Sequence, residues 1–479
     1  MKKYIIFLLF CVISSCFTLS EVIGMAPKKK AAEPVLSTGN IGEIVTGAFT
    51  EFTKCEPQLA ELKGVQRDNM CRAIKEVGGG AFGAKTFRNL RKGSIEGKLR
   101  MLKSLSEQKM VPGFPKTWPK SGEFGKGTFN IISADVSSLM QNSAFNGAVF
   151  QVASQFDCLE GVSYVQTGNI AGYQRDNTQG PRCVLSTLPA LVLRRYCLDP
   201  INLLLAITGK PVVTFPNAPI TNIAEHYGKV VNGYLVLPDE SKLGEFLINL
   251  KKKENEICIG YHYGVSVTHA VSGRSTLSVT PISGEHNVVD LCFFSTVDLG
   301  QGTNAHVYSE GKKEKLVEDI AQKLLGLAYE GILKSAFGED RHIIVLTLIG
   351  GGAFGNDINW IVTAIKVQIP FIVASGMKVW LNIFDRSVVD CVIGDLATMV
   401  GVTNGQFVST DSGLYTEAQM IEDKALVDTD VKNRLEKEIS ALGVLETIGC
   451  EQDSGPLVEA LNLLKIKLLG LAKALKVRE

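Results

Sequence analysis

The hydrophobic pattern divides the chain into a helical beginning and a strand-rich middle. From Ile41 to about Leu105 apolar residues recur at a spacing near 3.6, as in "NMCRAIKEV" and "EGKLRMLKSLSEQ", which predicts helices. Val111–Thr128 is dense in proline and glycine and is typical of a linker or extended loop. We therefore expect a helical region with a linker at 41–127, preceded by a disordered Lys-, Ala- and Pro-rich stretch at 25–40.

Beyond residue 128, short apolar runs rich in β-branched and aromatic residues predict strands, and helical patterns such as "EKLVEDIAQKLLGLAYEGILKSAF" separate several of them. Near-continuous apolar strands alternating with helices indicate an α/β domain with a covered, mixed or mostly parallel sheet, which we place at 128–376. The runs are "TFNII", "AVFQVAS", "PVVTF", "GYLVL", "EICIGYHYGVSVT", "VVDLCFFSTV", "HIIVLTLI" and "IPFIVAS".

The last part of the chain, 377–479, is predicted to be a helical extension. It ends in "SGPLVEALNLLKIKLLGLAKALKV", for which Ser454 is a suitable N-cap and Pro456 a suitable first-turn residue. This Leu/Lys helix either packs its leucine face on the domain or binds a membrane surface.

Composition narrows the class of function. The formal net charge is +1, so nothing supports a nucleic-acid partner. The 11 cysteines are scattered without a CxxC pair, and Cys258, Cys292 and Cys391 lie in apolar runs, which predicts reduced core residues rather than a disulfide framework or a zinc site. The 6 histidines show neither HExxH nor HxH spacing, so we expect no metal.

The N-terminal segment "MKKYIIFLLFCVISSCFTLS" has a basic start, an apolar stretch and then small polar residues, which is typical of a signal peptide or N-terminal anchor at 1–24. Cleavage after Ser20 or Gly24 fits this pattern, and "ISSC" ending at Cys16 weakly resembles a lipoprotein site. We expect a secreted or membrane-anchored protein that touches a membrane only through this segment. The alternative is a cytoplasmic protein that starts at Met25, which suits the cysteine pattern.

The six residues "GGGAFG" occur twice, at Gly78–Gly83 and Gly350–Gly355. The second copy stands between the predicted strand "HIIVLTLI" and a helix that Asn356 or Asp357 can cap. A strand, a glycine loop and a helix in this order place free N–H groups at a positive helix end, where they can hold a diphosphate, with Phe354 as an apolar wall. A merely tight strand-to-helix turn is the alternative. The first copy follows a charged helical pattern and is predicted to be a helix C-cap and flexible exit.

Two further blocks carry polar residues to the expected ligand side of the sheet. "AVFQVAS" is a predicted strand that delivers Gln155, Phe156 and Asp157 to its C-terminal end, where open α/β sheets bind ligands. "RDNTQGP" holds a polar cluster that leads into a helix, and a turn with local capping bonds is its alternative explanation. The members of that cluster are Asp176, Asn177, Thr178 and Gln179.

These blocks resemble the macro-domain family. "VLTLIGGGAFGNDINWIVTAI" (Val345–Ile365) is similar to the diphosphate-binding loop of its poly(ADP-ribose) glycohydrolase-like branch. "FNGAVFQVASQFDCLE" (Phe145–Glu160) resembles the strand and turn that face the distal ribose there, and "YQRDNTQGPRCVLSTLPALVLRRY" (Tyr173–Tyr196) resembles a signature of a divergent subgroup that includes a bacterial effector acting on ADP-ribosylated ubiquitin. The three motifs, in the right order, imply a macro-like three-layer α/β fold with a mixed central sheet, flanked by N- and C-terminal helical extensions.

The resemblance also implies the ligand, ADP-ribose, with no cofactor, and the role of each candidate residue. Gln155 would hydrogen-bond a ribose hydroxyl, Phe156 would stack on a ring, and Asp157 would accept from hydroxyls. Asp135, just after the first strand of the domain, would bind the adenine amino group, or is simply a helix N-cap. The remaining ligand-binding candidates are Asn177, Thr178, Gln179, Gly350, Gly351, Gly352, Ala353, Phe354, Gly355 and Asn356.

Release of ADP-ribose from a protein breaks the bond at the anomeric carbon of the distal ribose. The oxocarbenium-like transition state needs a nearby carboxylate and a positioned water or general acid. Poly(ADP-ribose) glycohydrolases carry adjacent glutamates after a related glycine loop, and no such pair follows "GGGAFG" here, which argues against cleavage of poly-ADP-ribose chains. The candidate carboxylates are Asp157, Asp176, Asp357 and, more remotely, Asp298, and of these Asp157 and Asp176 are the catalytic candidates.

The first functional hypothesis is therefore an ADP-ribosyl hydrolase that acts on a modified protein, for which the resemblance names ubiquitin as a candidate. A non-catalytic reader that binds ADP-ribose is the alternative, since it would need the diphosphate loop but no carboxylate. A third hypothesis is a secreted interaction protein whose macro-like fold has lost its ligand.

Overall fold

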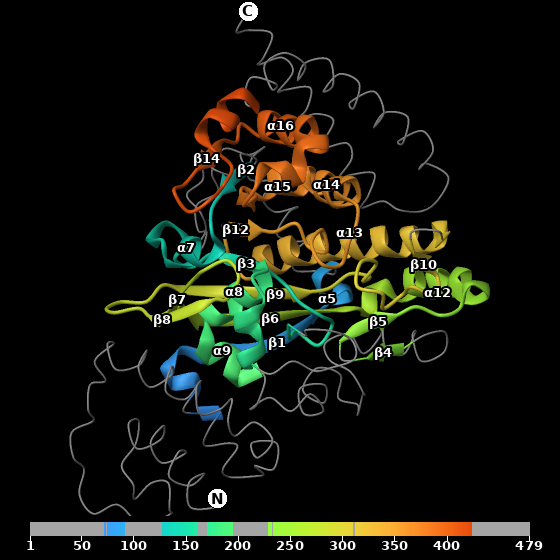
Figure 1. Cartoon of the computed structure of the whole chain (residues 1–479), viewed down its shortest axis with the longest axis horizontal. Helices are drawn as coiled ribbons and strands as arrows, with labels where there is room; N and C mark the ends of the chain where they lie inside the picture. Colours follow the sequence, from blue (N-terminus) through green and yellow to red (C-terminus); the bar gives the residue numbers. More distant parts are fainter. Residues whose placement is uncertain are drawn as a thin grey trace, which may run out of the picture. The chain divides into compact units, whose positions relative to one another are not determined.

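The computed structural model describes residues 71–72, 74–91, 127–160, 170–194, 229–231, 233–309 and 312–423 (Figure 1). The described residues fall into two compact units, the first drawn from 71–91 and 135–361 and the second from 127–134 and 362–423. The predicted signal peptide at 1–24, the stretch at 25–40, most of 41–127 and the helix beginning at Ser454 lie outside the described residues.

The first unit contains a mixed sheet in the order β1-β6-β9-β3-β12. Strands β3 and β12 both run parallel to their neighbours, while β6 is antiparallel to β1 and to β9. Side chains of β3 and β9 are buried along nearly their whole length, because helices cover both faces of the sheet. The bounds are β1 (Ala81–Thr86), β6 (Cys258–Ser266), β9 (Val288–Phe294), β3 (Val149–Ala153) and β12 (Ile343–Leu346).

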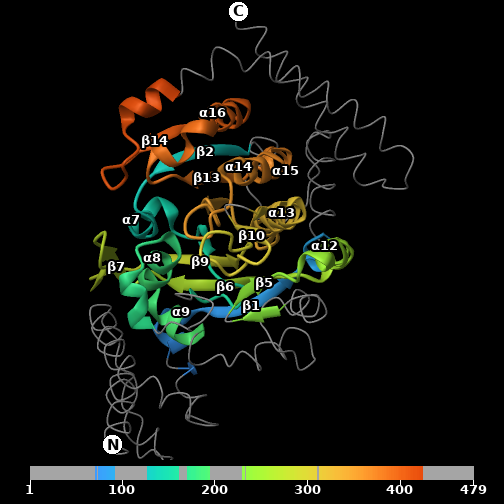
Figure 2. The ribbon, with the colours of Figure 1, turned by 45° about the vertical axis from the view of Figure 1, so that its right-hand side comes forward.

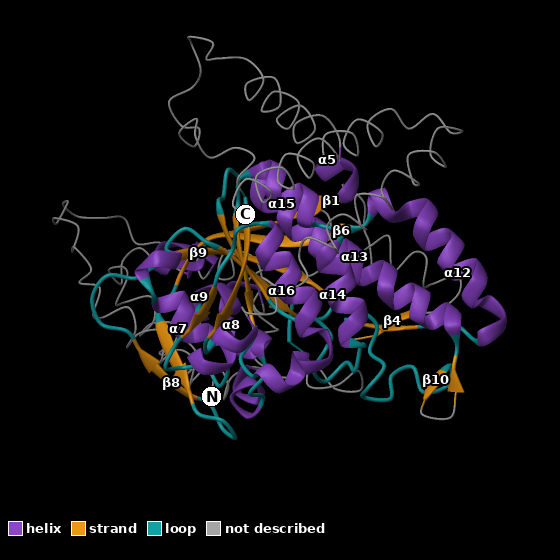
Figure 3. Ribbon diagram, turned by 90° about the horizontal axis from the view of Figure 1, so that it is seen from above, coloured by secondary structure: helices purple, strands orange, loops and turns teal. Residues whose placement is uncertain are grey.

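Helices form a layer on each side of this sheet (Figures 2 and 3). On one side α7 (Val136–Gln141) packs on α8 (Gln179–Ser186), α8 packs on β3, and α9 (Leu188–Val192) packs on β6. On the other side α13 (Lys315–Gly338) packs on β6 and β12 and also contacts α12 (Glu240–Lys253). The predicted three-layer α/β architecture with a mixed sheet is confirmed.

Smaller elements decorate the first unit. Two antiparallel hairpins, β4–β5 and β7–β8, and the short pair β10–β11 lie outside its main sheet. The bounds are η1 (Lys75–Gly79), α5 (Phe87–Arg91), η2 (Ser143–Phe145), η3 (Ile170–Arg175), β4 (Lys229–Val231), β5 (Tyr234–Val236), η5 (Glu254–Glu256), β7 (His269–Ser272), β8 (Ser278–Pro281), β10 (Tyr308–Ser309) and β11 (Lys312–Lys313).

The second unit is built on three parallel strands in the order β13-β2-β14. Two helices, α15 and α16, pack on β2. Helix α14 begins in the first unit and ends in the second. The bounds are β2 (Thr128–Ser133), α14 (Ile358–Lys366), α15 (Ile369–Ser375), β13 (Lys378–Asn382), η6 (Arg386–Val392), α16 (Ile393–Val402) and β14 (Phe407–Ser409).

Five sequence-based expectations differ from this structure. The run "IPFIVAS", expected to be a strand, forms helix α15, with Pro370 in its first turn and Gly376 in the left-handed region at φ 75° after its end. A run of seven residues is too short to show a clear hydrophobic period, so Pro370 near its start and Gly376 after its end decide that it forms a helix. Strands β1, β13 and β14 lie in stretches predicted to be helical. Cys258 and Cys292 are buried as predicted, but Cys391 is exposed.

One described stretch, Ile358–Ser375, is long and apolar enough to cross a membrane by length and composition alone, with a mean hydropathy of 1.5. This is weak evidence, because buried core helices pass the same test. The stretch consists of α14 with 9 residues and α15 with 7, each shorter than the roughly 20 residues of a spanning helix.

Candidate functional site

The second glycine loop lies in the setting that the sequence predicted. It follows β12 and precedes α14, whose first turn is capped by Asp357, since Oδ1 accepts from the Asn359 N–H at 2.7 Å. Gly350 and Gly355 have φ of 77° and 64°, a conformation that other residues adopt only with strain. A Cβ on Gly350 would also collide with Thr296, so the bend of this loop depends on glycine.

Four backbone N–H groups of this loop donate to no acceptor among the described residues. The loop's own hydrogen bonds use the N–H groups of Gly351, Gly355 and Asn356, which donate to the carbonyls of Leu348, Gly352 and Gly350. Unpaired N–H groups in a bend ahead of a helix form a site that favours an anion. The four groups belong to Gly350, Gly352, Ala353 and Phe354, of which Gly352 and Ala353 are exposed.

Asn356, predicted to bind the ligand, supports the loop from beneath. Its buried Nδ2 donates to the carbonyls of Val297 at 2.9 Å and Gly350 at 3.3 Å, and its Oδ1 accepts from the Thr296 hydroxyl at 3.1 Å. A buried amide has to be hydrogen-bonded, and these partners satisfy it within the protein. Asn356 therefore shapes the site rather than facing it.

A second loop, which follows β9, packs against the glycine loop and was not anticipated from the sequence. The Leu299 N–H donates to the Phe354 carbonyl at 2.8 Å. Asp298, a remote catalytic candidate, is buried and accepts from the N–H groups of Gly300 at 3.2 Å and Gln301 at 2.8 Å and from the Thr303 hydroxyl. Its carboxylate is committed to holding this loop in place.

The turn after β3 carries the other half of the candidate site. The Gln155 N–H donates to the Leu159 carbonyl at 3.0 Å, and Asp157 Oδ1 accepts from the Leu159 N–H at 3.0 Å. Gln155 Nε2 donates to the Tyr234 hydroxyl at 3.3 Å, and the Tyr234 ring lies 5.4 Å from that of Phe354. Tyr234 therefore joins the Asp157 turn to the glycine loop.

Tyr234 is a site residue that sequence reasoning missed, since "GYLVL" was interpreted only as a strand. Burial raises the pKa of its hydroxyl, and the nearby Asp298 and Asp157 carboxylates raise it further. The hydroxyl thus stays protonated at neutral pH. The preceding Gly233, at φ 81°, packs so closely on the Gln155–Asp157 turn that a Cβ there would meet both side chains.

Phe156 does not take the role that was expected for it. Its side chain is only 1% exposed and meets Phe294 edge-on, with ring centroids 5.6 Å apart and an interplanar angle of 82°. Burying a phenylalanine ring is worth about 2–3 kcal/mol, which favours this core position over an exposed one. The structure thus places Phe156 in the core rather than on a ligand-facing surface.

The cluster 176–179 is brought to the same end of β3. Asp176 Oδ1 accepts from the Thr178 N–H at 2.9 Å and hydroxyl at 2.6 Å, which is the local capping turn considered as an alternative. Gln179 Nε2 donates to the Gln151 carbonyl at 2.8 Å, and its Oε1 accepts from the Ala153 N–H at 3.1 Å. Gln179 thereby attaches the first turn of α8 to β3. Gly180 allows α8 to approach β3 this closely, because a Cβ at position 180 would collide with the Ala153 carbonyl.

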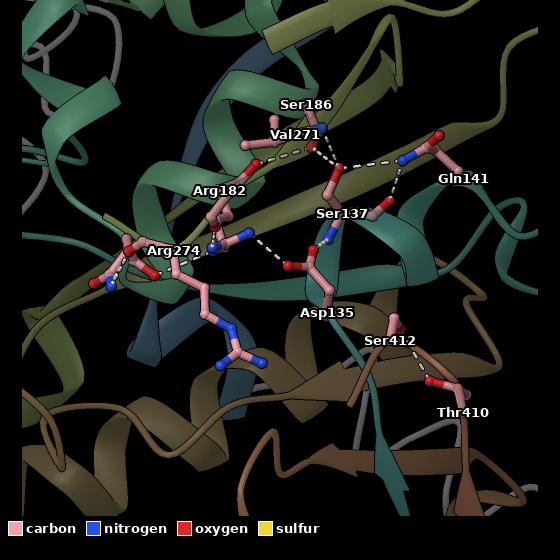
Figure 4. A network of polar contacts seen from close by, with 11 residues as sticks. Asp135, Ser137, Gln141, Arg182, Ser186, Val271, Arg274, Thr410 and Ser412 are labelled. Carbon is pink, nitrogen blue, oxygen red and sulfur yellow. Dashed lines mark hydrogen bonds and ion pairs between the residues drawn. The ribbon is translucent and has the colours of Figure 1, made fainter. Parts of the chain in front are cut away.

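Asp135 is the N-cap of α7 and part of a larger network (Figure 4). Its Oδ1 accepts from the Ser137 N–H at 2.8 Å, and its Oδ2 pairs with Arg182 of α8. Arg182 also donates to the Asn177 carbonyl at 3.1 Å and to the Gly273 carbonyl, which fixes the β7–β8 hairpin to α8. Both oxygens of Asp135 are thus engaged by the protein, as the N-cap alternative proposed.

Known proteins match this chain in structure rather than in sequence. No family model matches the sequence, and no curated protein matches it. The structural neighbours are poly(ADP-ribose) glycohydrolases.

Glycohydrolase structures from two organisms show the extent of the likeness. The Deinococcus radiodurans enzyme in complex with ADP-ribose is similar over 69% of this chain and 100% of its own, with 9% identity and a TM-score of 0.37. The Thermomonospora curvata enzyme is similar over 72% of this chain and 93% of its own, with 10% identity and a TM-score of 0.33. The complex of the Thermomonospora curvata enzyme with the inhibitor ADP-HPD is similar over 73% of this chain and 93% of its own, with 11% identity and a TM-score of 0.32. At identities and TM-scores this low, the function has to be judged from the chain's own residues.

The structure also shows a buried carboxylate that the sequence interpretation overlooked. Glu160 is 4% exposed, and neither carboxyl oxygen has a hydrogen-bond partner among the described residues. Burial raises the pKa of this carboxyl to about 8, although the Arg194 guanidinium opposes the rise and Asp157 adds to it. The sequence block "QFDCLE" contained this residue, but the sequence interpretation chose Asp157, the acid three positions before it, instead.

Metal-ligating side chains do not gather in the described part of the chain. No group of three or more His, Cys, Asp or Glu residues lies there in an arrangement that could hold an ion.

Proposed function

We propose that this chain is an ADP-ribosyl hydrolase that removes ADP-ribose from a modified protein by cleaving the bond at the anomeric carbon of the distal ribose. The observation that carries the proposal is the set of four unpaired N–H groups in the strand–loop–helix bend at Gly350–Phe354. Such a bend binds a diphosphate through the backbone alone.

The position of the Asp157 turn beside this loop supports hydrolysis as well as binding. Tyr234 contacts both the Phe354 ring and the Gln155 side chain, so one wall is shared by the diphosphate loop and the carboxylate turn. A diphosphate anchored on the loop holds the attached ribose against this turn, and such orientation contributes several kcal/mol to lowering a barrier. Asp157, with Asp176 nearby, then stabilises the positive charge of the oxocarbenium-like transition state or orients the attacking water.

We propose a single ADP-ribose unit on a protein as the substrate class. The adjacent glutamates of poly(ADP-ribose) glycohydrolases have no counterpart after the glycine loop in this sequence. Tyr173–Tyr196 resembles a motif of the bacterial effector MavL, an ADP-ribosyl-ubiquitin hydrolase, which makes ADP-ribosylated ubiquitin the first protein to test.

We further propose that residues 1–24 direct export or anchor the protein, as their basic and apolar pattern indicates. Fractionation of cells that produce the full chain or a chain starting at Met25 tests this. Recovery of both forms in the cytoplasm would contradict it.

The decisive experiment pairs binding with product release. Calorimetry with ADP-ribose should show a saturable site, and mono-ADP-ribosylated proteins, including ubiquitin, should release free ADP-ribose. Asp157→Ala and Asp176→Ala should each lower the release rate about 100-fold or more, because each removes charge from the transition state. Asp239→Ala, at an exposed position before α12, is the matched control and should leave the rate unchanged.

Other results of the binding and release assays would indicate a different function or different catalytic residues. Binding without release would identify a non-catalytic reader, and no binding would contradict both an enzyme and a reader. Normal release by both carboxylate variants would exclude Asp157 and Asp176 as catalytic residues.

A further inference from the structure

Arg194 occupies a central position beneath the candidate site. It lies two residues past the end of α9, and its side chain is 5% exposed. Its Nε donates to the Cys158 carbonyl at 3.2 Å, its Nη1 donates to His262 Nδ1 on β6 at 3.1 Å, and its guanidinium lies over the Phe293 ring of β9 at 4.2 Å. One buried side chain thus ties the turn after β3 to two strands of the sheet.

His262 is suited to hold the guanidinium. An arginine can only donate, so His262 Nδ1 must accept, and its proton then resides on Nε2. Burial lowers the pKa of His262 well below its usual range, and the Arg194 charge lowers it further, so the ring stays neutral. The acceptor is therefore present at neutral and alkaline pH.

The carbonyl that Arg194 holds belongs to a strained residue. Cys158 has φ of 61°, a left-handed conformation that costs a residue other than glycine about 1–2 kcal/mol. Asp157 immediately precedes it, so the direction of the Asp157 carboxylate depends on whether this conformation is kept. The Glu160 N–H, donating to the Tyr173 hydroxyl at 3.3 Å, fixes the far end of the same turn.

We propose that Arg194 is a positioning residue for Asp157, holding the strained Gln155–Glu160 turn through the Cys158 carbonyl, and that ionised Glu160 weakens this hold by attracting the guanidinium. The proposal rests on the proposed hydrolase function for its link to activity, whereas the hold itself is a property of the turn.

Glu160 has both the burial and the unused hydrogen-bonding capacity for this role. Its two carboxyl oxygens and the Nη2 of Arg194 are buried without a hydrogen-bond partner among the described residues. With a pKa raised to about 8 by burial, the carboxyl is neutral at pH 7 and becomes charged as the pH passes 8.

Arg194 is the cation that acts on Glu160, and the other titratable groups around it are acids or thiols. An ionised Glu160 is therefore drawn to Arg194 and repelled by the Asp157 and Asp176 carboxylates, while the buried thiols stay protonated and neutral. The groups that face Glu160 or its partner are Asp157 and Cys158 of the same turn, Tyr173 of η3, Asp176 before α8, Cys183 of α8, Arg194 after α9 and the neutral His262 of β6.

The first test replaces the charge of Glu160 and keeps its shape. In the wild type, kcat should fall as the pH rises through 8, toward a plateau about tenfold lower that is set by the weakened hold, whereas Glu160→Gln should hold its pH 7 value to pH 9. The ADP-ribose Kd should change less than threefold in both, because the glycine loop is untouched. Glu417→Gln, at an exposed position, is the control and should follow the wild-type profile.

The second test replaces the guanidinium. Arg194→Lys keeps the charge but cannot bond the Cys158 carbonyl and His262 at once, so kcat should fall about tenfold or more while the ADP-ribose Kd stays within threefold. If Arg194→Lys does not fold, His262→Gln serves instead, with a smaller fall in kcat expected because the Cys158 bond remains.

Amide hydrogen exchange of residues 155–160 provides a readout that needs no activity. After correction for intrinsic rates, wild-type protection should decrease between pH 7 and pH 9, and Glu160→Gln should keep it. A wild type that releases no ADP-ribose but shows this exchange pattern would refute the proposed function and leave the hold by Arg194 supported. Unchanged protection and unchanged kcat in both Arg194→Lys and Glu160→Gln would overturn the inference. A lowered kcat in Arg194→Lys with a wild-type pH profile in Glu160→Gln would overturn the part played by Glu160.

Discussion

Several polar residues at the candidate site bind the protein's own backbone. Gln179 satisfies the Ala153 N–H and the Gln151 carbonyl at the end of β3, and Asn356 satisfies the carbonyls of Val297, after β9, and of Gly350 in the glycine loop. Backbone groups that lose their strand partner at a sheet edge must find another when they are buried. The same side-chain chemistry that could bind a ribose hydroxyl is used here to build the surface on which a ligand would lie.

Gly350→Ala tests the dependence of the anion loop on backbone conformation. The variant should lose about 2 kcal/mol of stability, because a left-handed φ is strained for alanine and the new Cβ meets Thr296. Its affinity for ADP-ribose should fall about tenfold or more as the N–H groups turn away. Urea unfolding and calorimetry measure the two effects.

Gly352→Ala is the matched control for stability, since an added Cβ there meets nothing within 4 Å. Its unfolding free energy should stay within about 0.5 kcal/mol of the wild type. Equal losses in the two variants would contradict the role given to the φ of Gly350.

Glu160→Gln should also change how stability depends on pH. The folded carboxyl, with its pKa raised by burial from 4.5 to about 8, keeps a proton that the unfolded chain has lost. The stability from this group is therefore fully present below pH 4.5 and declines as the pH rises toward 8, by about 3 kcal/mol between pH 5 and pH 7.5. Urea unfolding at the two pH values should show that decline in the wild type and a smaller one in Glu160→Gln. Parallel pH dependence in the two proteins would place the carboxyl in water instead.

At the scale of elements, the two identical "GGGAFG" segments form different structures. In Gly78–Gly83 the glycines end η1, with Gly78 and Gly80 at φ of 95° and 67°, and Ala81 begins strand β1. In Gly350–Gly355 the same six residues form an exposed loop before a helix. The C-cap predicted for the first copy agrees with the structure, but its exit is an edge strand paired with β6 rather than a flexible segment. Pairing partners thus decide the element that a short, glycine-rich run adopts.

Gly80→Ala should show which of the two "GGGAFG" segments binds the diphosphate. A Cβ at Gly80 would collide with the Tyr263 carbonyl, and its φ is left-handed, so stability should fall by about 2 kcal/mol. The folded variant should nevertheless bind ADP-ribose with the wild-type Kd, since the anion loop is elsewhere in the fold. Loss of affinity in the folded variant, measured by calorimetry, would instead place the diphosphate at the first copy.

At the scale of the whole molecule, each compact unit contains its own buried carboxylate anchor. In the first unit Asp290 accepts from Arg341 at 2.7 Å, from the Tyr261 hydroxyl at 2.9 Å and from the Gly264 N–H at 2.7 Å. In the second, Asp423 accepts from Arg386 at 2.7 and 2.8 Å and from the Tyr415 hydroxyl. Both carboxylates are almost fully buried, so their loss leaves partners unpaired.

Asp290→Asn and Asp423→Asn form a reciprocal pair of variants. Each should destabilise its own unit by about 2–4 kcal/mol, because a half-buried arginine loses the buried carboxylate that pairs with it. Hydrogen exchange should show lost protection within 135–361 for Asp290→Asn and within 127–134 and 362–423 for Asp423→Asn. The same loss of protection over both units in each variant would show that the two unfold as one cooperative body.

The sequence alone determined the elements with strong periodicity and the local setting of the anion loop. The helix at Lys315–Gly338, the buried strands at β3, β6 and β9, and the strand–loop–helix order around Gly350 follow from patterns that local physics controls. An apolar run needs burial, and a turn with a left-handed φ needs glycine, whichever distant segments pack against them.

Only the tertiary structure decided which side chains face the site, because burial and pairing depend on neighbours that are distant in sequence. It placed Phe156 against Phe294, turned "IPFIVAS" into a helix and paired β1 with β6. It also brought Tyr234 to Phe354, and Arg194 to the Cys158 carbonyl of the Asp157 turn, from segments that no local pattern connects.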